Sequence, residues 1–509
     1  MPRLGRPETA AGLSAWAERL SARSFAERGD APAVLPALYR RKGVLYARFC
    51  GRGFRVLMGP RQVRTFRLGE QPGRKEGGEM ELLAGWDAAD ITPPTGVEIA
   101  GYGFGPSVGV LDPLEAQVLW LESGEERLVL AAVDLLTFGP GPLAAVRRDV
   151  ARETGVPAER VLVAASHSHS APTLMPLRQW GRVDPGYARD VERKIVGAVL
   201  RARGASAPVR AGFGCGSGAG LLANRRQGSS ITDAAVPVLR FEALDGADTA
   251  VVYGFGCHPV TLHGYRNLLS ADYAGHVRRR VREDLGRGAA ALFLLGPSGD
   301  INPAGYVHGA ATEGRVRALG EPLASEVIRV ARDSAPEKDA TLRFLREIVE
   351  LPVVELPPRS GLAAARERFA REAGEAERAG RPWVERSELE INRDWAEDAL
   401  AERERGQRRT VSCELAAARI GSAAILWAPL ELFTETGLAI RRSSPFVLTA
   451  IASNANGGLG YLPTADAYLS PDYTNPQGLA PKVYGVLALA PEAEPLFRAR
   501  AIALLGGLT

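Results

Sequence analysis

From residue 82 onward, short apolar segments alternate with segments of helical periodicity, and this alternation is the strongest constraint on the fold. The apolar segments that predict buried strands are RLVLAAVDLL (127–136), which ends near Asp134, RVLVAAS (160–166), TAVVYGFGCHPV (249–260) and AAALFLLGPSGD (289–300). The last two strands are expected to run into Gly-rich loops. The segments with helical spacing are PGPLAAVRRDVARETG (140–155), DVERKIVGAVLRAR (190–203) and DYAGHVRRRVREDLG (272–286). Strands separated by helices predict an α/β (mixed α+β) fold, in which layered mixed β-sheets are flanked by helices.

Two further helices are predicted in the stretch 360–408, which is rich in alanine, glutamate and arginine. The triplet RPW separates them, and charged residues occur along their whole length. Helices of this kind are typical of a solvated insertion. We therefore expect a charged helical insertion that has no catalytic role.

Residues 1–79 differ from the rest of the chain in charge. They contain 16 basic and 7 acidic residues, whereas residues 80–509 contain 47 basic and 52 acidic residues. No clear hydrophobic periodicity marks the first segment, so we expect a basic, poorly ordered N-terminal extension at 1–79 and one domain at 80–509. The mild acidity of that domain argues against a nucleic-acid partner.

The cysteine pattern and the apolar segments bear on location. The four cysteines are scattered and form no CxxC pair, which favours a reducing cytoplasm. The chain contains no apolar run of 18 residues, so we expect no transmembrane segment. Prolines interrupt the N-terminal patch APAVLPALY (31–39), so no signal peptide is evident. No pattern in the chain predicts its oligomeric state.

Histidines at the ends of predicted strands are the first candidates for chemistry. The motif SHSHSAP (166–172) places His167 and His169 two residues apart, which on a strand would direct both side chains to one face. Imidazole is the commonest metal-binding side chain, although a pair of polar loop residues is the more frequent meaning of such a motif. His258 ends another predicted strand and His263 follows five residues later, and ligands gather beyond the carboxyl ends of strands in α/β sheets.

Three other segments carry polar residues after apolar runs. The loop GPSGDINPAG (296–305) contains Ser298, Asp300 and Asn302, and it lacks both the Gly-Lys-Ser/Thr of a phosphate-binding loop and the second glycine of a nucleophile elbow. Turn chemistry alone, or backbone N–H groups directed at a ligand, would explain it. Glu431 follows an apolar run, where it is either solvated or a third metal ligand. The segment 453–476 is a long Gly-, Asn- and Tyr-rich loop, and loops of that length are often functional.

Taken in order, several motifs resemble those of the neutral/alkaline ceramidase family. The segments are ADITPPTGVEIAGYG, ASHSHSAP, LLANRR, CHPVTLHG with LLSADYAG, GPSGDINP, PLELFTETG and the tyrosine-containing loop. The resemblance is to the N-terminal catalytic domain of that family and covers roughly residues 82–490. Members of the family hydrolyse the amide bond of N-acyl sphingosines with a single zinc ion. The resemblance therefore implies a zinc hydrolase domain at 80–509.

The resemblance also implies roles for individual residues. The zinc ligands would be His167, His258, Glu431 and Tyr461. His169 would face the substrate carbonyl, Arg225 in the motif NRR would help to bind it, and Tyr473 would be a second functional tyrosine. This donor set suits Zn²⁺, which lowers the pKa of a bound water and polarises a carbonyl. The three remaining side chains could then stabilise an oxyanion.

The chain departs from the family pattern in the loop that contains Asp300 and Asn302, both of which remain candidate catalytic residues. The family carries Gly-Asp-x-Ser-Pro-Asn there, and Asn302 stands where the serine would be. We also expect the C-terminal immunoglobulin-like domain of the full ceramidases to be missing, since few residues follow the tyrosine-containing loop. The leading hypothesis is a zinc-dependent amidohydrolase acting on a small N-acyl substrate. The alternatives are a zinc-dependent esterase or hydrolase of another small polar molecule, and a non-catalytic metal- or ligand-binding relative.

Overall fold

The computed structural model describes residues 81–509 apart from short gaps, and it describes the backbone of four strands before residue 81. The gaps are 103–104, 245, 247–248, 264, 308–311, 338–340 and 470–477. Contacts between Cα atoms divide the chain into two units, Met1–Arg74 and Lys75–Thr509. The two units are described separately below.

The first unit contains an antiparallel sheet in which neighbouring strands are consecutive in the chain. Its strands are β1 (Ala37–Arg41), β2 (Val44–Phe49), β3 (Arg52–Met58) and β4 (Val63–Arg67). These strands were not expected from the sequence, because no clear alternation of apolar and polar residues marks them. The other residues of 1–79 lie outside the described part of the chain, and the poorly ordered extension stays a prediction.

The second unit is built on a mixed sheet of eight described strands. In their order across the sheet, these are β11 (Val161–Ala165), β10 (Glu126–Val133), β9 (Glu115–Ser123), β5 (Leu82–Asp90), β12 (Ala207–Ser217), β14 (Ala235–Ala243), β15 (Thr249–Phe255) and β17 (Ala290–Leu295). The pairs β10–β11 and β15–β17 are parallel, and the other pairs are antiparallel. The two parallel pairs therefore lie at the two ends of the strand order.

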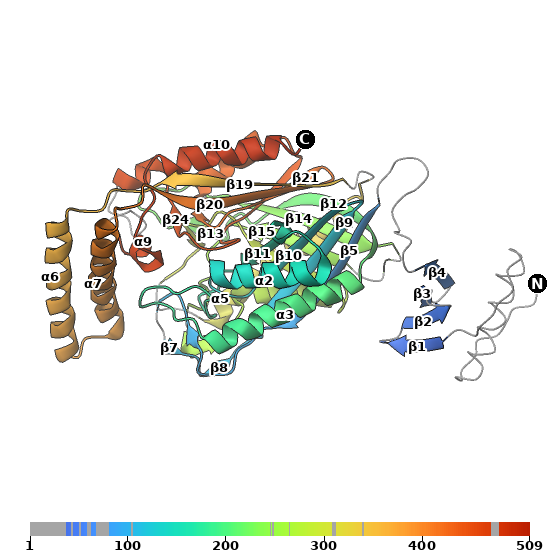
Figure 1. The fold of residues 1–509 in the computed structure, drawn as a ribbon, viewed down its shortest axis with the longest axis horizontal. Helices are drawn as coiled ribbons and strands as arrows, with labels where there is room; N and C mark the ends of the chain where they lie inside the picture. Colours follow the sequence, from blue (N-terminus) through green and yellow to red (C-terminus); the bar gives the residue numbers. More distant parts are fainter. Residues whose placement is uncertain are drawn as a thin grey trace, which may run out of the picture. The chain divides into compact units, whose positions relative to one another are not determined.

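A second, smaller sheet packs face to face on the first (Figure 1). Its strands are β19 (Leu342–Pro352), β20 (Thr410–Ile420), β21 (Ala423–Trp427) and β23 (Leu448–Ala452). Leu121 and Leu292 of the large sheet share one buried apolar cluster with Ile425 and Trp427 of the small sheet. The apolar area removed from water between the sheets is the main stabilising contribution to this packing.

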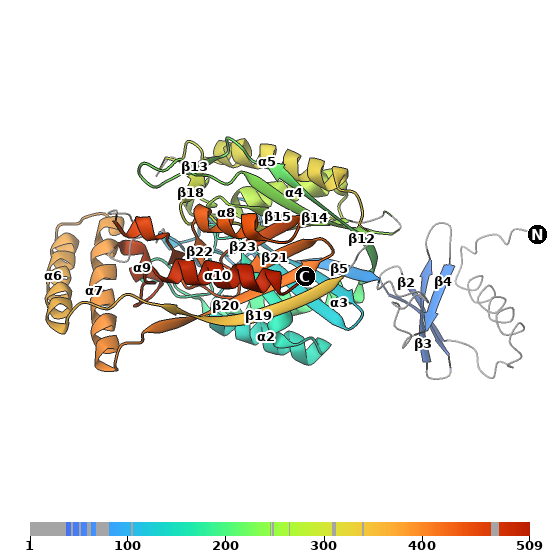
Figure 2. The same cartoon turned by 90° about the horizontal axis from the view of Figure 1, so that it is seen from above.

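Helices cover the outer faces of both sheets, as Figures 1 and 2 show. The large sheet is covered by α2 (Pro140–Thr154), α3 (Pro185–Gly204), α4 (Asp272–Leu285) and α5 (Glu313–Asp333), and the small sheet by α8 (Thr434–Ser443) and α10 (Ala493–Gly506). Val146 and Ile195 bury against one end of the large sheet, and Phe497 and Leu505 bury against the small one. The prediction of layered mixed sheets flanked by helices is confirmed, and none of the described helices has the length and apolar character needed to cross a bilayer.

The charged insertion consists of two helices, α6 (Arg359–Arg378) and α7 (Trp383–Glu404), which pack side by side (Figure 2). The prediction of two helices separated at RPW is confirmed. One face of α7 is not solvated, because Ile391 is fully buried in an apolar cluster with Trp180. The indole Nε1 of Trp180 donates to Ser387 Oγ at 3.2 Å. The insertion is therefore attached to the main unit through α7.

Candidate metal centre

The centre forms because a loop joins the two ends of the large sheet. After β23, the backbone N–H of Ser453 donates to Leu295 O at 2.7 Å, which fixes the loop to the end of β17. The next residue, Asn454, accepts from Ala165 N at 3.1 Å, which fixes the same loop to the end of β11. The segments that follow β11, β15 and β17 therefore meet at one place.

The strands predicted within 249–260 and 289–300 are present, and each runs into a glycine-containing loop, because β15 ends at Phe255 and β17 ends at Leu295. The residues that follow form two loops in close contact. A Cβ atom on Gly256 would lie 2.5 Å from Pro297 O, so only glycine fits there without a shift of the backbone. This close approach brings Ser298 beside His258.

Two imidazole rings are held in the same way, each by a backbone carbonyl. His167 Nδ1 lies 2.8 Å from Leu136 O, and His258 Nδ1 lies 2.7 Å from Ser298 O. A carbonyl oxygen can only accept, so each Nδ1 carries the hydrogen and each Nε2 presents a lone pair. Both side chains are 1% exposed. This arrangement is the usual support for a histidine that binds a metal through Nε2.

The two Nε2 atoms face one carboxylate oxygen. Glu431 begins β22 (Glu431–Leu432), and its Oε2 lies 3.6 Å from His167 Nε2 and 3.2 Å from His258 Nε2. Within the described residues, Glu431 Oε2 and His258 Nε2 are buried and make no hydrogen bond of good geometry. A tetrahedral ion with bonds of about 2.0–2.1 Å keeps its ligand atoms about 3.3 Å apart. These donors therefore fit a metal ion.

Burial and neighbouring charge set the protonation of these groups. Burial and the charge of Arg225 lower the pKa of His258 to about 4, so the imidazole is neutral at neutral pH. Burial alone would raise the pKa of Glu431, but its interactions with His167 and His258 and the hydrogen bond from Tyr484 outweigh burial and lower the pKa to about 2. The centre thus offers two imidazole nitrogen donors and one carboxylate, a donor set that a divalent cation can bind.

Tyr461 lies beside Glu431 through a parallel pair of short strands. It begins β24 (Tyr461–Leu462), and the register places it opposite Glu431. Its hydroxyl accepts a hydrogen bond from Arg225 Nη2 at 3.0 Å, and Arg225 also donates to Gly299 O through Nη2 at 2.6 Å. Burial raises the pKa of Tyr461, and the charge of Arg225 opposes this rise. Arg225 therefore supports the phenol oxygen electrostatically.

His169 lies next to the two ligand imidazoles, with its ring centroid 4.8 Å from that of His167 and 5.7 Å from that of His258. Nitrogen atoms of the three rings all lie within 4.8 Å of one another, so His169 could also serve a metal. Within the described residues, neither ring nitrogen of His169 has a hydrogen-bond partner, although the side chain is 6% exposed. Such a group is available to a ligand.

The ring of His169 packs on Gly101. A Cβ atom at Gly101 would lie 2.4 Å from His169 Nδ1, and the φ of Gly101 is +111°. Both facts exclude a side chain at this position. His167 and His169 lie in a loop, because β11 ends at Ala165 and His167 has a φ of 65°. The prediction that a strand directs both side chains to one face is therefore wrong.

No protein-family model and no curated protein sequence matches the chain. Among solved structures, neutral ceramidase from Pseudomonas aeruginosa matches with a TM-score of 0.65 and 17% identity, covering 84% of this chain and 74% of that one. A structure of ceramidase complexed with C2 matches with a TM-score of 0.64 and 17% identity, covering 84% and 75% of the two chains. The chain has the neutral ceramidase fold.

Within this ceramidase-like fold, Asp300 acts through other residues. Its Oδ1 accepts from the backbone N–H and from the hydroxyl of Thr434, both at 2.8 Å, and its Oδ2 accepts from Asn224 Nδ2 at 2.9 Å. Thr434 begins the helix α8, so the carboxylate satisfies an otherwise unpaired N–H at a helix start. Asp300 therefore positions the segment after Glu431. The loop N–H of Gly299 donates to Leu432 O at 2.8 Å and is not directed at a ligand.

Two other residues, Tyr473 and Asn302, were also candidates from the sequence. Tyr473 lies outside the described residues, so its role stays a prediction. Asn302 lies in β18 (Ile301–Pro303), which pairs with β13 (Leu222–Asn224) beside the centre. The inference below concerns its side chain.

Tyr484 belongs to the candidate centre but was not found from the sequence. It ends α9 (Leu479–Tyr484), and its hydroxyl donates a short hydrogen bond to Glu431 Oε1. This bond leaves Oε2 to face the two imidazoles. No motif surrounds Tyr484, and a tyrosine at the end of a short helix is most often packing, so no pattern in the chain identified it. Support of this kind for a metal-binding carboxylate tunes the affinity of the site.

Replacing Tyr484 with phenylalanine is expected to weaken metal binding by about 10- to 100-fold, because Glu431 would lose the hydrogen bond that orients it. Titration of the metal-stripped protein with Zn²⁺ measures the effect. Tyr468, whose hydroxyl donates to Leu489 O at 2.9 Å, provides the control: Tyr468→Phe should bind the ion as the unaltered protein does. Equal affinity of Tyr484→Phe and the unaltered protein would contradict this role.

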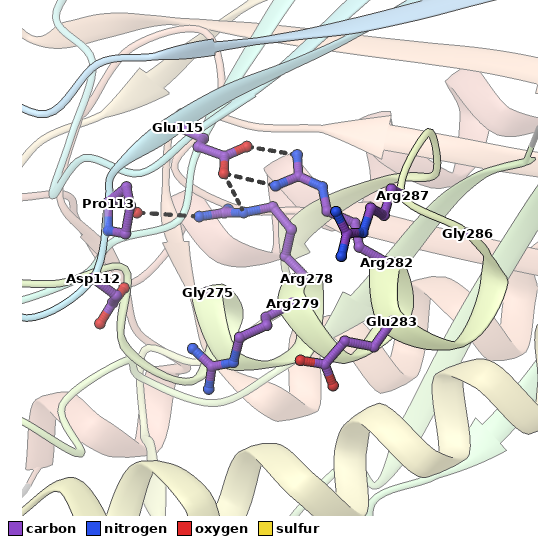
Figure 3. Close-up of a pocket in the computed structure, with 10 residues that line it drawn as sticks. All are labelled: Asp112, Pro113, Glu115, Gly275, Arg278, Arg279, Arg282, Glu283, Gly286 and Arg287. Carbon is purple, nitrogen blue, oxygen red and sulfur yellow. Dashed lines mark hydrogen bonds and ion pairs between the residues drawn. The ribbon is translucent and has the colours of Figure 1, made fainter.

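The pocket in Figure 3 contains none of the residues described above. It has a volume of about 510 Å³ and is lined by four arginines of and beyond α4, with Asp112, Glu115 and Glu283. Arg282 donates to both oxygens of Glu115 at 2.7 and 2.8 Å, and Arg278 pairs with Asp134 at 2.7 Å. These ion pairs neutralise much of the positive charge of the arginines, so the pocket gives no basis for proposing a second ligand site.

Proposed function

We propose that the chain is a zinc-dependent hydrolase that cleaves the amide bond of a small N-acyl substrate. The observation that carries the proposal is the buried Oε2 of Glu431, which faces Nε2 of both His167 and His258 without a hydrogen bond of good geometry in the described residues. Tyr461 would complete the set of protein ligands. When bound, Zn²⁺ supplies a water of lowered pKa and polarises a carbonyl group. The likeness to ceramidase structures supports the reaction class.

The remaining residues are placed to stabilise developing charge. His169 presents a buried ring with no hydrogen-bond partner in the described residues, so it can bind the substrate carbonyl oxygen. Arg225 is half-buried and positively charged, and it holds Tyr461 through the phenol oxygen. A fixed positive charge in a dry site stabilises an oxyanion more strongly than it would in water. Tyr102 packs against His169 with ring centroids 5.0 Å apart and narrows the site.

Metal analysis and an amide-hydrolysis assay on the same preparation test the proposal. We expect one zinc ion per chain and hydrolysis of at least one member of a series of N-acyl amides at neutral to alkaline pH. Removal of the metal should abolish hydrolysis, and added Zn²⁺ should restore it. A natively folded protein that neither contains nor takes up a metal would overturn the proposal. A protein with bound zinc that leaves the whole series intact would favour a non-catalytic relative.

An esterase is the second candidate function, because a metal-activated water can attack an ester carbonyl as well as an amide carbonyl. Assays of amide and ester analogues in parallel separate the two. For location, we propose the cytoplasm. Two observations support this location. Cys215, Cys257 and Cys413 form no disulfide among the described residues, and the cysteines are scattered along the sequence.

A further inference from the structure

The strand pairing of Asn302 fixes the direction of its side chain. In the β13–β18 ladder Asn302 lies opposite Ala223, and Arg225 N donates to Asp300 O at 2.8 Å, which extends the ladder by one residue. Residues two apart on a strand project to the same face, and so do directly opposed residues. Asn302 and Arg225 therefore share one face of this ribbon.

That face carries the candidate metal centre. Arg225 reaches Tyr461 from it, with Nη2 3.0 Å from the phenol oxygen. The opposite face is occupied by Ile301, which is fully buried in the apolar cluster of β15, β17, α4 and α5. The carbonyl of Ile301 accepts from His258 N at 3.2 Å, so Asn302 also adjoins the segment of a ligand histidine. Asn302 thus adjoins two parts of the centre, Arg225 and the segment that contains His258.

The carboxamide of Asn302 has no partner in the described part of the chain. Its Oδ1 is buried and accepts no hydrogen bond there. Asn224, on the same ribbon, differs: its Nδ2 donates to Ile231 O and Asp300 Oδ2, and its Oδ1 accepts from Arg226 N. A buried acceptor without a donor is energetically unfavourable, so Asn302 Oδ1 is available to a donor that arrives with a ligand.

A secondary amide brings such a donor next to the carbonyl that reacts, because its nitrogen carries a hydrogen. An ester of the same acyl group has no hydrogen at the corresponding oxygen and would leave the acceptor unpaired. Sites built to hydrogen-bond a substrate N–H or O–H discriminate strongly against analogues that lack it. We propose that Asn302 Oδ1 accepts a hydrogen bond from the N–H of the scissile amide and thereby makes the centre select amides over esters. This inference rests on the proposed hydrolase function and names the substrate class of that same site.

The test compares an N-acyl amide with the ester of the same acyl group and a leaving group of the same carbon skeleton. The measured quantity is the ratio of kcat/KM for the amide to kcat/KM for the ester. Asn302→Leu keeps the size of the side chain and removes the acceptor, so we expect the ratio to fall by about 10- to 100-fold. Asn302→Asp keeps an acceptor at the same place, and the ratio should stay within about threefold of that of the unaltered protein. Asn302→Ala serves in place of the leucine variant if that variant does not fold.

The outcomes separate this inference from the proposed function. Metal content and circular dichroism establish that each variant is loaded and folded. If Asn302→Leu lowers the two kcat/KM values by the same factor, or changes neither, the contact with the amide N–H is overturned while the hydrolase proposal stands. If Asn302→Asp loses the preference as fully as Asn302→Leu does, the acceptor role is overturned as well. An unaltered protein that cleaves neither substrate in a broad acyl series overturns the proposed function and this inference with it.

Discussion

Replacing His258 with alanine is expected to remove the metal and to lower kcat/KM for an N-acyl amide by at least about 10³-fold. His258 Nε2 lies 3.2 Å from Glu431 Oε2, and its Nδ1 is held by Ser298 O, so the ring is fixed in the orientation that a ligand needs. Without it, the carboxylate of Glu431 is left buried beside a single imidazole. A metal ion contributes several kcal/mol to charge stabilisation in the transition state, and its loss accounts for the expected decrease.

Metal stoichiometry and steady-state kinetics on the same preparation measure the effect of His258→Ala. The matched control is His276→Ala. His276 lies on α4 and is also buried, but its Nε2 pairs with Glu321 Oε2 on α5 at 2.9 Å, away from the proposed metal ligands. This control should keep its metal and most of its activity. Exogenous imidazole can fill the space left in His258→Ala and should restore part of both. Full zinc content in His258→Ala would show that the ion is held elsewhere.

Replacing Arg225 with methionine is expected to lower kcat by about 10²- to 10³-fold while the metal stays bound. The guanidinium group of this half-buried residue donates to Tyr461 Oη at 3.0 Å and to Gly299 O at 2.6 Å, and it carries the fixed positive charge of the site. Methionine keeps the length of the side chain but removes the charge and both donors. The transition state carries more negative charge than the ground state, so the loss falls mainly on kcat.

The neighbouring arginine provides the control for Arg225→Met. Arg226 Nη2 pairs with Asp466 at 2.7 Å, and Arg226→Met should keep kcat within about threefold of the unaltered value. Arg225→Lys keeps the charge but lacks the rigid planar guanidinium that fixes the donors in place, so it should fall between the unaltered protein and Arg225→Met. A rise in KM with unchanged kcat would mean that Arg225 binds substrate and transition state equally. Loss of zinc would mean that its role is to position Tyr461.

The part of the fold that local sequence patterns determine was predicted. The alternation of strands and helices, the layered mixed sheets and the two helices of the insertion are all present in the structure. Each of these follows from hydrophobic periodicity within about 10–20 residues. The strands β1 to β4 lack that signal, and they were missed.

The candidate centre was predicted in its residue types but not in its construction. His167, His258 and Glu431 were chosen from strand-end positions and from a family resemblance, and the structure brings them together. The contact that joins them, made by the loop after β23 to both β11 and β17, depends on residues nearly 300 positions apart and leaves no local pattern. Tyr484 was missed for the same reason, since its partner Glu431 is distant in the sequence. Long-range tertiary contacts are what local patterns cannot encode.

The loop that links the two ends of the large sheet also orders events during folding. The donors come from positions between His167 and Tyr461, and no two of the elements that carry them are joined by a short turn. Closing such long stretches of chain is entropically costly, so these contacts form late. An ion that binds only the completed centre stabilises the folded chain in proportion to the logarithm of its concentration, by about 2.7 kcal/mol at 100 times its Kd. We therefore expect the chain to fold nearly to completion before an ion can stabilise it, and we expect chelation to lower its thermal stability without changing the order in which it folds.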